Sequence, residues 1–243
     1  MNNNKKILIF IPAFNVEKKI FKVVERIPIK IFETNEIKIL IINDNSNDNT
    51  VREIEKIQSK FNYDFEIINS EKQLGYGGVQ KISFNYAIKK NFDYVIMLHG
   101  DGQYAPEELP KFIAELKNAD FDAVFGSRMM NYKSAIRGGM PVYKFLGNIF
   151  LTFIQNLILN SNVSEFHSGY RSFKVNALKK IKFFELPDYY HFDTEMIIEL
   201  LKKKMTLKEI YIPTFYGDEV SHLKSIPYGL KVLYSTIKSK FKK

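Results

Sequence analysis

The chain contains no cysteine. Disulfides, thiolate metal sites and a cysteine nucleophile are therefore excluded, and a reducing compartment is favoured. Residues 1–10 lack a long apolar stretch followed by small residues, so we interpret them as a polar lead-in and a first strand instead of a signal peptide. There is no Gly-Lys-Ser/Thr P-loop, and Gln80 stands where a dinucleotide-binding pattern requires its last glycine.

The most apolar stretch, residues 142–160, is interrupted by Lys144, Asn148, Gln155 and Asn156. A spanning helix needs about 20 mostly apolar residues, so we expect no membrane span. The stretch has apolar residues at helical spacing, namely Val142, Leu146, Ile149, Phe150, Phe153 and Leu157. Such a face either packs in the core or lies on a bilayer surface, and the sequence leaves both open.

The 243 residues carry a formal net charge of +9. This charge suits nucleotide phosphates, a membrane surface or nucleic acid, although a biased genome composition would produce it as well. The lysines are spread along the chain and no recognition motif for nucleic acid occurs, so we expect no nucleic-acid partner.

Short apolar runs alternate with amphipathic segments along the chain. The pattern predicts strands at 6–11, 37–42, 64–68, 94–98, 122–125 and 208–213, and helices at 17–27, 50–60, 78–90, 106–118, 142–159 and 192–204. We expect a loop at 131–141 and a short strand or turn at 168–173. Nearly continuous apolar strands that alternate with helices indicate an α/β fold with a mainly parallel sheet covered on both faces.

Polar residues follow the predicted strands at their carboxyl ends, where open α/β sheets bind ligands. These segments are 12–15, 43–48, 73–78, 99–103 and 126–128. Each alone is typical of a turn. Five in succession, meeting at one edge of the sheet, favour a binding site, and the glycines at 75–78 would let the backbone approach a ligand closely.

The segment His99-Gly100-Asp101 places two metal-ligand types at alternate positions where a strand ends. A turn at Gly100 could aim both side chains at one ion, and Gln103 could add a carbonyl oxygen. Carboxylate, imidazole and substrate phosphates together suit Mg²⁺ or Mn²⁺. The alternative is that His99 only caps the strand.

Taken in order, these motifs resemble the inverting family-two glycosyltransferases of the GT-A fold, a Rossmann-like three-layer sandwich with a mixed central sheet. The resemblance is closest to the polyprenol-phosphate (dolichol-phosphate) mannosyl- and glucosyltransferases and covers about residues 6–215. It rests on IPAFN at 11–15, NDNSNDNT at 43–50, QLGYGG at 73–78, HGDGQYAPEELP at 99–110, GSR at 126–128 and SGYRSF at 168–173. It implies a catalytic domain over 1–220, followed by a basic and helical C-terminal tail over 221–243.

The resemblance also implies roles for individual residues. The nucleotide-sugar donor would meet Pro12, Ala13, Asn15, Glu17, Asp44, Asn45, Ser46, Gly75 and Arg128. The acceptor or its phosphate would meet Glu165, Ser168, Arg171, His222 and Lys224. Asp101 would hold a divalent metal, Mg²⁺ or Mn²⁺, with His99 and Gln103. The sequence departs from the family pattern at His99 and Asn43, which replace acids, and at Val16, which replaces a glutamate.

The expected reaction is hexose transfer from a GDP- or UDP-sugar to a polyprenyl-phosphate-type lipid, with inversion and metal assistance. A lipid phosphate is already anionic and needs no strong base, whereas a saccharide hydroxyl needs a carboxylate to take its proton. Asp193 and Glu195 are the candidate bases. Both could instead be helix N-terminal acids stabilised by the helix dipole. Transfer to a saccharide in surface-polysaccharide synthesis and a non-catalytic nucleotide-sugar binder remain alternatives.

The segment after residue 220 holds Lys224, Lys231, Lys238, Lys240, Lys242 and Lys243 and no acid. These lysines would add about 1 kcal/mol each near anionic lipid, or would simply be solvated. We expect a cytoplasmic enzyme bound peripherally at the inner face of the membrane, working with a separate membrane protein, because many lipid-phosphate relatives carry additional membrane helices.

Overall fold

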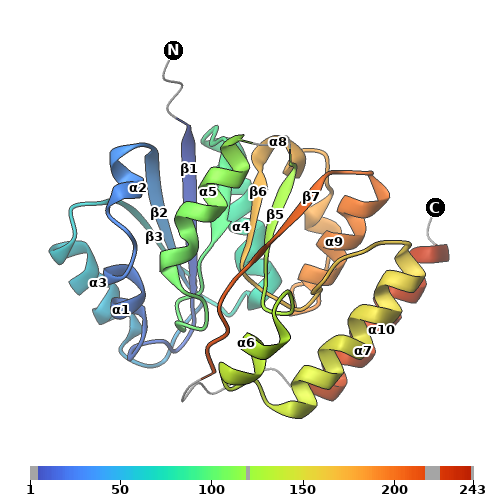
Figure 1. The fold of residues 1–243 in the computed structure, drawn as a ribbon. Coiled ribbons are helices and arrows are strands. Elements are labelled where there is room, and N and C mark those ends of the chain that lie inside the picture. The colour runs from blue at the N-terminus through green and yellow to red at the C-terminus, as the bar shows by residue number, and fades with distance from the viewer. Residues whose placement is uncertain (1–4, 119–120, 217–224, 242–243) are drawn as a thin grey trace.

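The computed structural model describes residues 5–118, 121–216 and 225–241 (Figure 1). Within these ranges the strands are β1 Lys6–Ala13, β2 Glu36–Asn43, β3 Asp64–Asn69, β4 Tyr94–Met97, β5 Ala123–Ser127, β6 Arg171–Lys174 and β7 Leu207–Tyr211. The α-helices are α1 Ile20–Glu25, α2 Lys30–Glu33, α3 Thr50–Lys60, α4 Gly75–Lys89, α5 Leu109–Asn118, α6 Tyr132–Arg137, α7 Val142–Leu159, α8 Val175–Leu178, α9 Phe192–Lys202 and α10 Ser225–Phe241. Two 3₁₀ turns, Pro106–Glu108 and Phe183–Glu185, complete the order.

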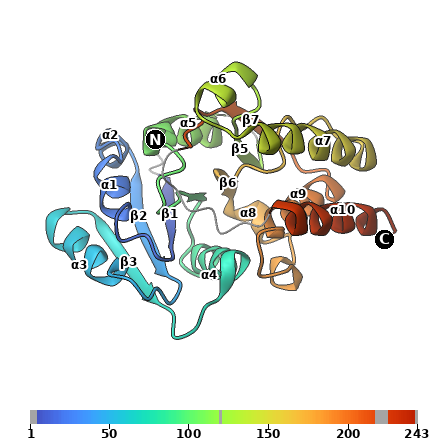
Figure 2. The same ribbon diagram turned by 90° about the horizontal axis from the view of Figure 1, so that it is seen from below.

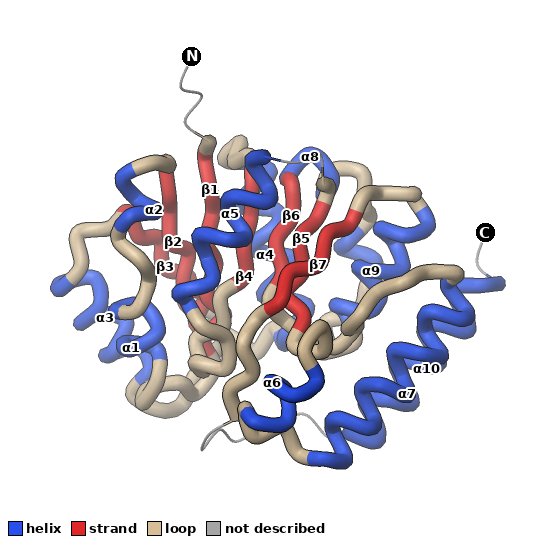
Figure 3. The backbone as a smooth tube through the Cα atoms, viewed as in Figure 1, coloured by secondary structure: helices blue, strands red, loops and turns tan. Residues whose placement is uncertain are grey.

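The strands form one sheet in the order β3-β2-β1-β4-β6-β5-β7 (Figure 3). All neighbouring pairs are parallel except those of β6, which runs antiparallel to both β4 and β5. The carboxyl ends of β1 to β5 therefore meet at one edge, as predicted. The mixed, mainly parallel three-layer architecture is confirmed.

Alternate side chains of β1 fill two separate cores. Ile7, Ile9 and Ile11 pack in the layer that contains residues of α1, α2, α3 and α5. Leu8 and Phe10 pack in the layer that contains residues of α4, α8 and α9. Since successive strand side chains point to opposite faces, a strand that is apolar at both parities must be covered on both sides. This explains why the strands are nearly continuous apolar runs.

Two local predictions were wrong. Residues 131–141, expected as a loop, contain the helix α6, whose N-cap Asn131 accepts a hydrogen bond from the Ser134 N–H. The glycine-rich segment, expected as a turn before a helix starting at 78, is already helical from Gly75. Asp44 causes this early start, because its carboxylate accepts the N–H groups of Leu74 at 2.5 Å and Gly75 at 3.0 Å.

The C-terminal segment is helical over α10, which packs against α7 and α9. Figure 2 shows α7 and α10 side by side at one end of the sheet, beyond β7 and α9. Of the predicted acceptor residues, His222 and Lys224 lie outside the described residues.

Candidate active site at the carboxyl edge of the sheet

The loop after β1 and the loop after β2 are joined by reciprocal hydrogen bonds. The Asn15 N–H donates to Ser46 Oγ at 3.0 Å, and Asn15 Oδ1 accepts the Asn47 N–H at 3.0 Å. Asn15 has a φ of 52°, a left-handed conformation that asparagine tolerates better than most residues. The sequence predicted Asn15 and Ser46 as neighbours in a nucleotide site, and the structure brings them into contact.

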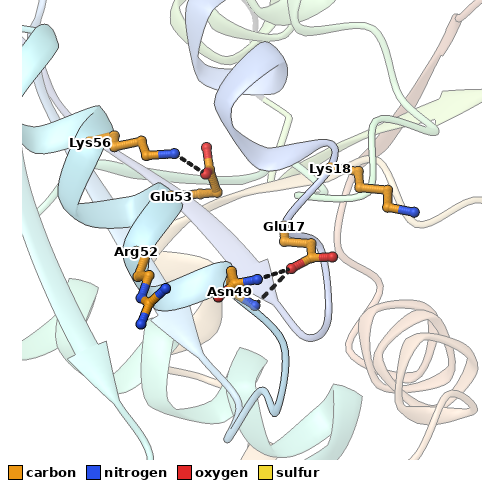
Figure 4. A pocket seen from close by; sticks show the side chains of 6 residues that line it. All are labelled: Glu17, Lys18, Asn49, Arg52, Glu53 and Lys56. Atoms are coloured by element: carbon orange, nitrogen blue, oxygen red, sulfur yellow. Dashed lines mark hydrogen bonds and ion pairs between the residues drawn. The ribbon is translucent and has the colours of Figure 1, made fainter.

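Glu17 extends the same junction on its outer side. Its Oε2 accepts the backbone N–H and the side-chain amide of Asn49, both at 2.9 Å (Figure 4). Together with Lys18, Arg52, Glu53 and Lys56, these two residues line a hollow of about 400 Å³. Glu17 therefore ties the first loop to the N-terminus of α3, and its carboxylate is directed to Asn49.

Asp44 is 5% exposed and uses both oxygens on the start of α4. The glycines of that turn face protein instead of open space. A Cβ at Gly75 would lie 2.7 Å from the Asp188 carbonyl oxygen, and one at Gly77 would lie 2.4 Å from that of Pro187. These glycines permit close packing of the 187–188 segment against the start of α4.

His99 lies just beyond the end of β4. Its Nε2 is 3.2 Å from the Gly169 carbonyl oxygen. A carbonyl oxygen only accepts, so Nε2 donates in this bond, and in the neutral imidazole Nδ1 then carries the lone pair. A Cβ at Gly169 would lie 2.6 Å from His99 Nε2, so a larger residue here would displace the imidazole. The contact joins the HGDGQ and SGYRSF motifs.

Asp101 and Gln103 form a tight turn after His99. Asp101 Oδ1 accepts the Gln103 N–H at 3.0 Å, and the side chain is partly exposed. In the described residues no three His, Asp or Glu side chains form a metal cluster.

Three tyrosine side chains lie around this motif, and the sequence interpretation did not single them out. Tyr104 lies 4.7 Å from the His99 ring and accepts the Gly169 N–H at 2.7 Å. Tyr76 stacks on Tyr190 at 5.2 Å between centroids. Burial, with the nearby negative charges of Asp101 and Asp44, raises the pKa of Tyr190. Tyr76 and Tyr104 are inside the quoted motifs, but nothing in the sequence marks Tyr190.

Several residues expected to contact phosphate or acceptor lie in the interior. Arg171 is 1% exposed, and it donates to the carbonyl oxygens of Ser168, Asp193 and Phe166 at 2.7 to 3.1 Å. Ser168 is 2% exposed. This placement does not support direct phosphate contact by Arg171, since a ligand could reach its guanidinium only if the packing opened.

Arg128 and Glu165 form a buried ion pair. Arg128 Nε donates to Glu165 Oε1 at 3.0 Å, and the guanidinium Nη2 also contacts that oxygen. Burial opposes both charges, but the pair outweighs it, so the pKa of Arg128 is raised and that of Glu165 is lowered. Glu165 is fully enclosed and accepts Asn148 as well. It holds Arg128 in place, and this enclosure does not support direct contact with an acceptor.

The two candidate bases on α9 differ in their surroundings. Asp193 is 6% exposed and accepts the Tyr76 hydroxyl at 2.8 Å and the Gln80 amide at 2.9 Å, beside Arg171. Its carboxylate is thus occupied by interior donors. Glu195 is partly exposed on the first turn of the same helix. Of the two, Glu195 is the more exposed carboxylate.

We compared the chain with known protein families and solved structures. The model for Glycosyl transferase family 2 covers residues 8–182. Fold and site together define a glycosyltransferase with the GT-A fold, and the chain belongs to glycosyltransferase family 2.

The relatives are named for several acceptors. UDP-N-acetylglucosamine–dolichyl-phosphate N-acetylglucosaminyltransferase of Methanococcus voltae is 29% identical over 99% of this chain and 98% of its own length. Undecaprenyl-phosphate mannosyltransferase of Micrococcus luteus is 20% identical over 90% and 87%. Glucosyl-3-phosphoglycerate synthase of Mycobacterium tuberculosis, solved with Mn²⁺, UDP and phosphoglyceric acid, aligns over 97% of this chain and 78% of its own with a TM-score of 0.73 at 13% identity.

Proposed function

We propose that this glycosyltransferase moves a hexose from a GDP- or UDP-sugar to a polyprenyl-phosphate-type lipid, with inversion and with a divalent metal. The observation that carries the proposal is the end of β4, beside the interlocked β1 and β2 loops. There His99 Nδ1 and Asp101 Oδ2 have no hydrogen-bond partner among the described residues. The names of the full-length relatives, which include dolichyl and undecaprenyl phosphates, support this acceptor class.

The donor set fits Mg²⁺ or Mn²⁺. Asp101 Oδ2 and His99 Nδ1 would hold the ion, with the Gln103 amide oxygen in support and the donor diphosphate completing the shell. Metal-binding histidines commonly donate their other N–H to a backbone carbonyl, as His99 does to Gly169. When bound, the metal would supply positive charge where the leaving diphosphate develops negative charge.

The residues of the chain would then position the donor. The two loops that meet at Asn15 and Ser46, together with Pro12 and Asn45, would form the nucleoside side of the site. Ala13, which the sequence placed there too, is fully buried in the core and would act only by supporting Pro12. The buried Glu165 fixes Arg128 near this edge, where its remaining N–H could meet a phosphate. A lipid phosphate attacks without a strong base, so the enclosure of Asp193 does not hinder this reaction.

One observation favours a second candidate, transfer to a saccharide hydroxyl. Glu195 is partly exposed at the start of α9 and could accept a proton there. Loss of transfer to a saccharide on Glu195→Gln, with donor binding intact, would favour this candidate. Unchanged transfer to lipid phosphate in the same variant would favour the first.

The donor site is tested by thermal shift with GDP, UDP and their sugars, with and without Mn²⁺. Selective binding to the folded state raises the melting temperature. We expect a metal-dependent shift with one base in the wild type and none in Asp101→Asn. A folded protein that no nucleotide shifts would contradict the proposal. Binding without transfer or hydrolysis would instead identify a non-catalytic nucleotide-sugar binder.

We propose a cytoplasmic location at the inner face of the membrane, a separate membrane protein as a partner, and a catalytic unit over residues 1–220. Support comes from the positive charge and from the acceptor class.

A further inference from the structure

Helix α7 buries polar residues and exposes apolar ones, the reverse of a surface helix on a water-soluble protein. Its buried residues are polar: Asn148, Thr152 and Gln155. Its most exposed large side chains are apolar or aromatic: Val142 70%, Tyr143 64%, Leu146 58%, Phe150 58%, Phe153 65% and Leu157 72%. Surface helices normally turn the apolar stripe inward and the polar face outward. The stripe named from the sequence therefore lies on the outside, except for Ile149, which packs partly buried against Met129 and Met140.

Helix α10 shows the same inversion. It buries Ser235, Thr236 and Ser239 together with Val232. It exposes Ile226 79%, Leu230 65%, Tyr234 64%, Ile237 49% and Phe241 80%. Apart from the adjacent pair Val142 and Tyr143, the exposed residues of each helix recur every three or four positions, so each helix presents one continuous stripe.

The two helices pack side by side, with a Cβ at Gly229 of α10 lying 3.6 Å from Leu151 of α7 (Figures 1 and 2). Each buries its opposite side against the body or its neighbour, so both stripes face away from the body. We call the eleven exposed residues of these stripes the helix-pair face. Contiguous exposed apolar patches of this kind mark interaction sites, because leaving them in water is unfavourable.

The charges on this pair indicate what covers it. Neither α7 nor α10 contains an acidic residue, and their charged residues are Lys144, Lys231, Lys238 and Lys240. Pairing with a second copy through this face would bring lysines of like charge together. A bilayer with acidic headgroups has an apolar layer beneath an anionic surface. The apolar layer would cover the exposed stripes, and the anionic headgroups would attract the lysines.

By length and composition α7 could also cross a membrane, since its 18 residues have a mean hydropathy of 1.4. The contacts of α7 with the body favour a helix that lies along the membrane surface. Asn148 Nδ2 donates to Glu165 Oε1 at 2.7 Å, and that carboxylate holds Arg128. Insertion across the bilayer would remove these polar groups from their partners, at high cost in hydrocarbon.

We propose that the helix-pair face is a membrane-docking surface that seats α7 and α10 in the headgroup region of an anionic bilayer. The proposal deepens the proposed function and rests on it only for the identity of the acceptor. The docked helices connect to the catalytic edge. Tyr228 of α10 contacts His167 Nδ1 through its hydroxyl at 2.9 Å, and Gly169, two residues on, accepts His99.

The test is flotation of the full chain with vesicles of phosphatidylcholine alone or with phosphatidylglycerol. We expect the wild type to float with the anionic vesicles. Leu146→Ser/Phe150→Ser/Phe153→Ser should bind about tenfold or more weakly, because it removes apolar area from the face. The control Ile29→Ser/Phe184→Ser removes side chains of similar exposure, 64% and 59%, outside the two helices and should float normally. Lys238→Gln and Lys240→Gln should each weaken binding about fivefold.

Melting temperature and nucleotide-induced shift are measured on every variant. All substituted side chains are exposed, so folding should be kept. Flotation without any nucleotide shift would leave the docking surface standing and remove the proposed function. Equal flotation of the triple variant and the control would overturn the docking surface. The docking surface would also be overturned if the wild type formed a dimer that does not bind vesicles and the triple variant were monomeric.

Discussion

The two halves of the chain place their polar residues in opposite ways. In the first half, the polar side chains after β1, β2 and β4 stay at the edge of the sheet, where Asn15, Ser46 and Asp101 bond to loop backbone. In the second half, charged and polar residues turn inward, as Arg171, Asp193 and Asn148 do, while apolar side chains cover the outside of α7 and α10. The first arrangement suits a small polar ligand, and the second suits an apolar environment.

The largest effect is expected at the catalytic edge. Asp101→Asn removes the carboxylate that we propose as metal ligand, and loss of such electrostatic stabilisation lowers turnover by about 10³-fold. The measurement is transfer rate at saturating donor, with unfolding by denaturant as a folding control. Because the Asp101 side chain is partly exposed and, among the described residues, its hydrogen bond is to its own turn, stability should change little. A rate within about fivefold of wild type would contradict the role.

In the second half of the chain, where charged side chains are buried, we expect the next largest effect, a loss of unfolding free energy. Arg128→Ala leaves Glu165 buried without its cation, and breaking a buried pair costs about 3–5 kcal/mol. The matched control is Arg26→Ala, which breaks the exposed bidentate pair with Glu107 and should cost at most about 1 kcal/mol. Equal losses in the two variants, measured by urea unfolding, would remove the contrast that we draw.

His167 makes a pH prediction for the link between α10 and the site. Burial lowers the pKa of His167 to about 4, whereas an unfolded histidine titrates near 6.5. Between these values the unfolded chain binds the proton and the folded chain does not, so stability falls as the pH drops below about 6.5. From pH 7 to pH 5 the unfolding free energy should lose about 2 kcal/mol through this residue.

The check on His167 compares urea unfolding of the wild type and His167→Asn at the two pH values. The variant should lose about 2 kcal/mol less than the wild type over this interval. Identical losses would show that the imidazole is not held neutral beside Tyr228.

The smallest effect concerns the loop junction. Asn15→Ala loses the bond to the Asn47 N–H and adopts a left-handed φ less readily, which should cost about 1 kcal/mol. Asn91→Ala is the control, because Asn91 has a φ of 56° after α4 and lies away from the loops. Both should lose stability, but only Asn15→Ala should weaken nucleotide binding. If Asn15→Ala and Asn91→Ala bound nucleotide with equal affinity, the junction at Asn15 would not belong to the donor site.

The sequence predicted the sheet well because its signals are local. The strands at 6–11 and 37–42 appear as Lys6–Ala13 and Glu36–Asn43, and proline with acids at 106–108 marked the start of a helical segment. The short α6 was missed because a six-residue helix with glycines after it carries little periodicity. The antiparallel insertion of β6 between β4 and β5 is a long-range pairing that no local pattern encodes.

The site was predictable in position more than in detail. Motif order identified Asn15, Asp44, His99 and Asp101, and the structure places them at or near the carboxyl edge of the sheet. Periodicity also showed which residues of α7 share a face, but it could not tell whether that face meets the body or the outside. The same limit applies to Arg171. The sequence cannot distinguish an arginine that donates to interior carbonyl oxygens, as Arg171 does, from one that binds a phosphate.

The most direct test of the account measures sugar transfer into lipid. The full chain is incubated with Mn²⁺, labelled UDP- or GDP-sugar, and anionic vesicles that contain a polyprenyl phosphate, and label is counted in the organic extract. We predict lipid-linked label for the wild type, its loss in Asp101→Asn, and its reduction in Leu146→Ser/Phe150→Ser/Phe153→Ser although the nucleotide-induced thermal shift is kept. Donor binding without labelled lipid under any donor, together with label on a soluble saccharide acceptor, would contradict the account.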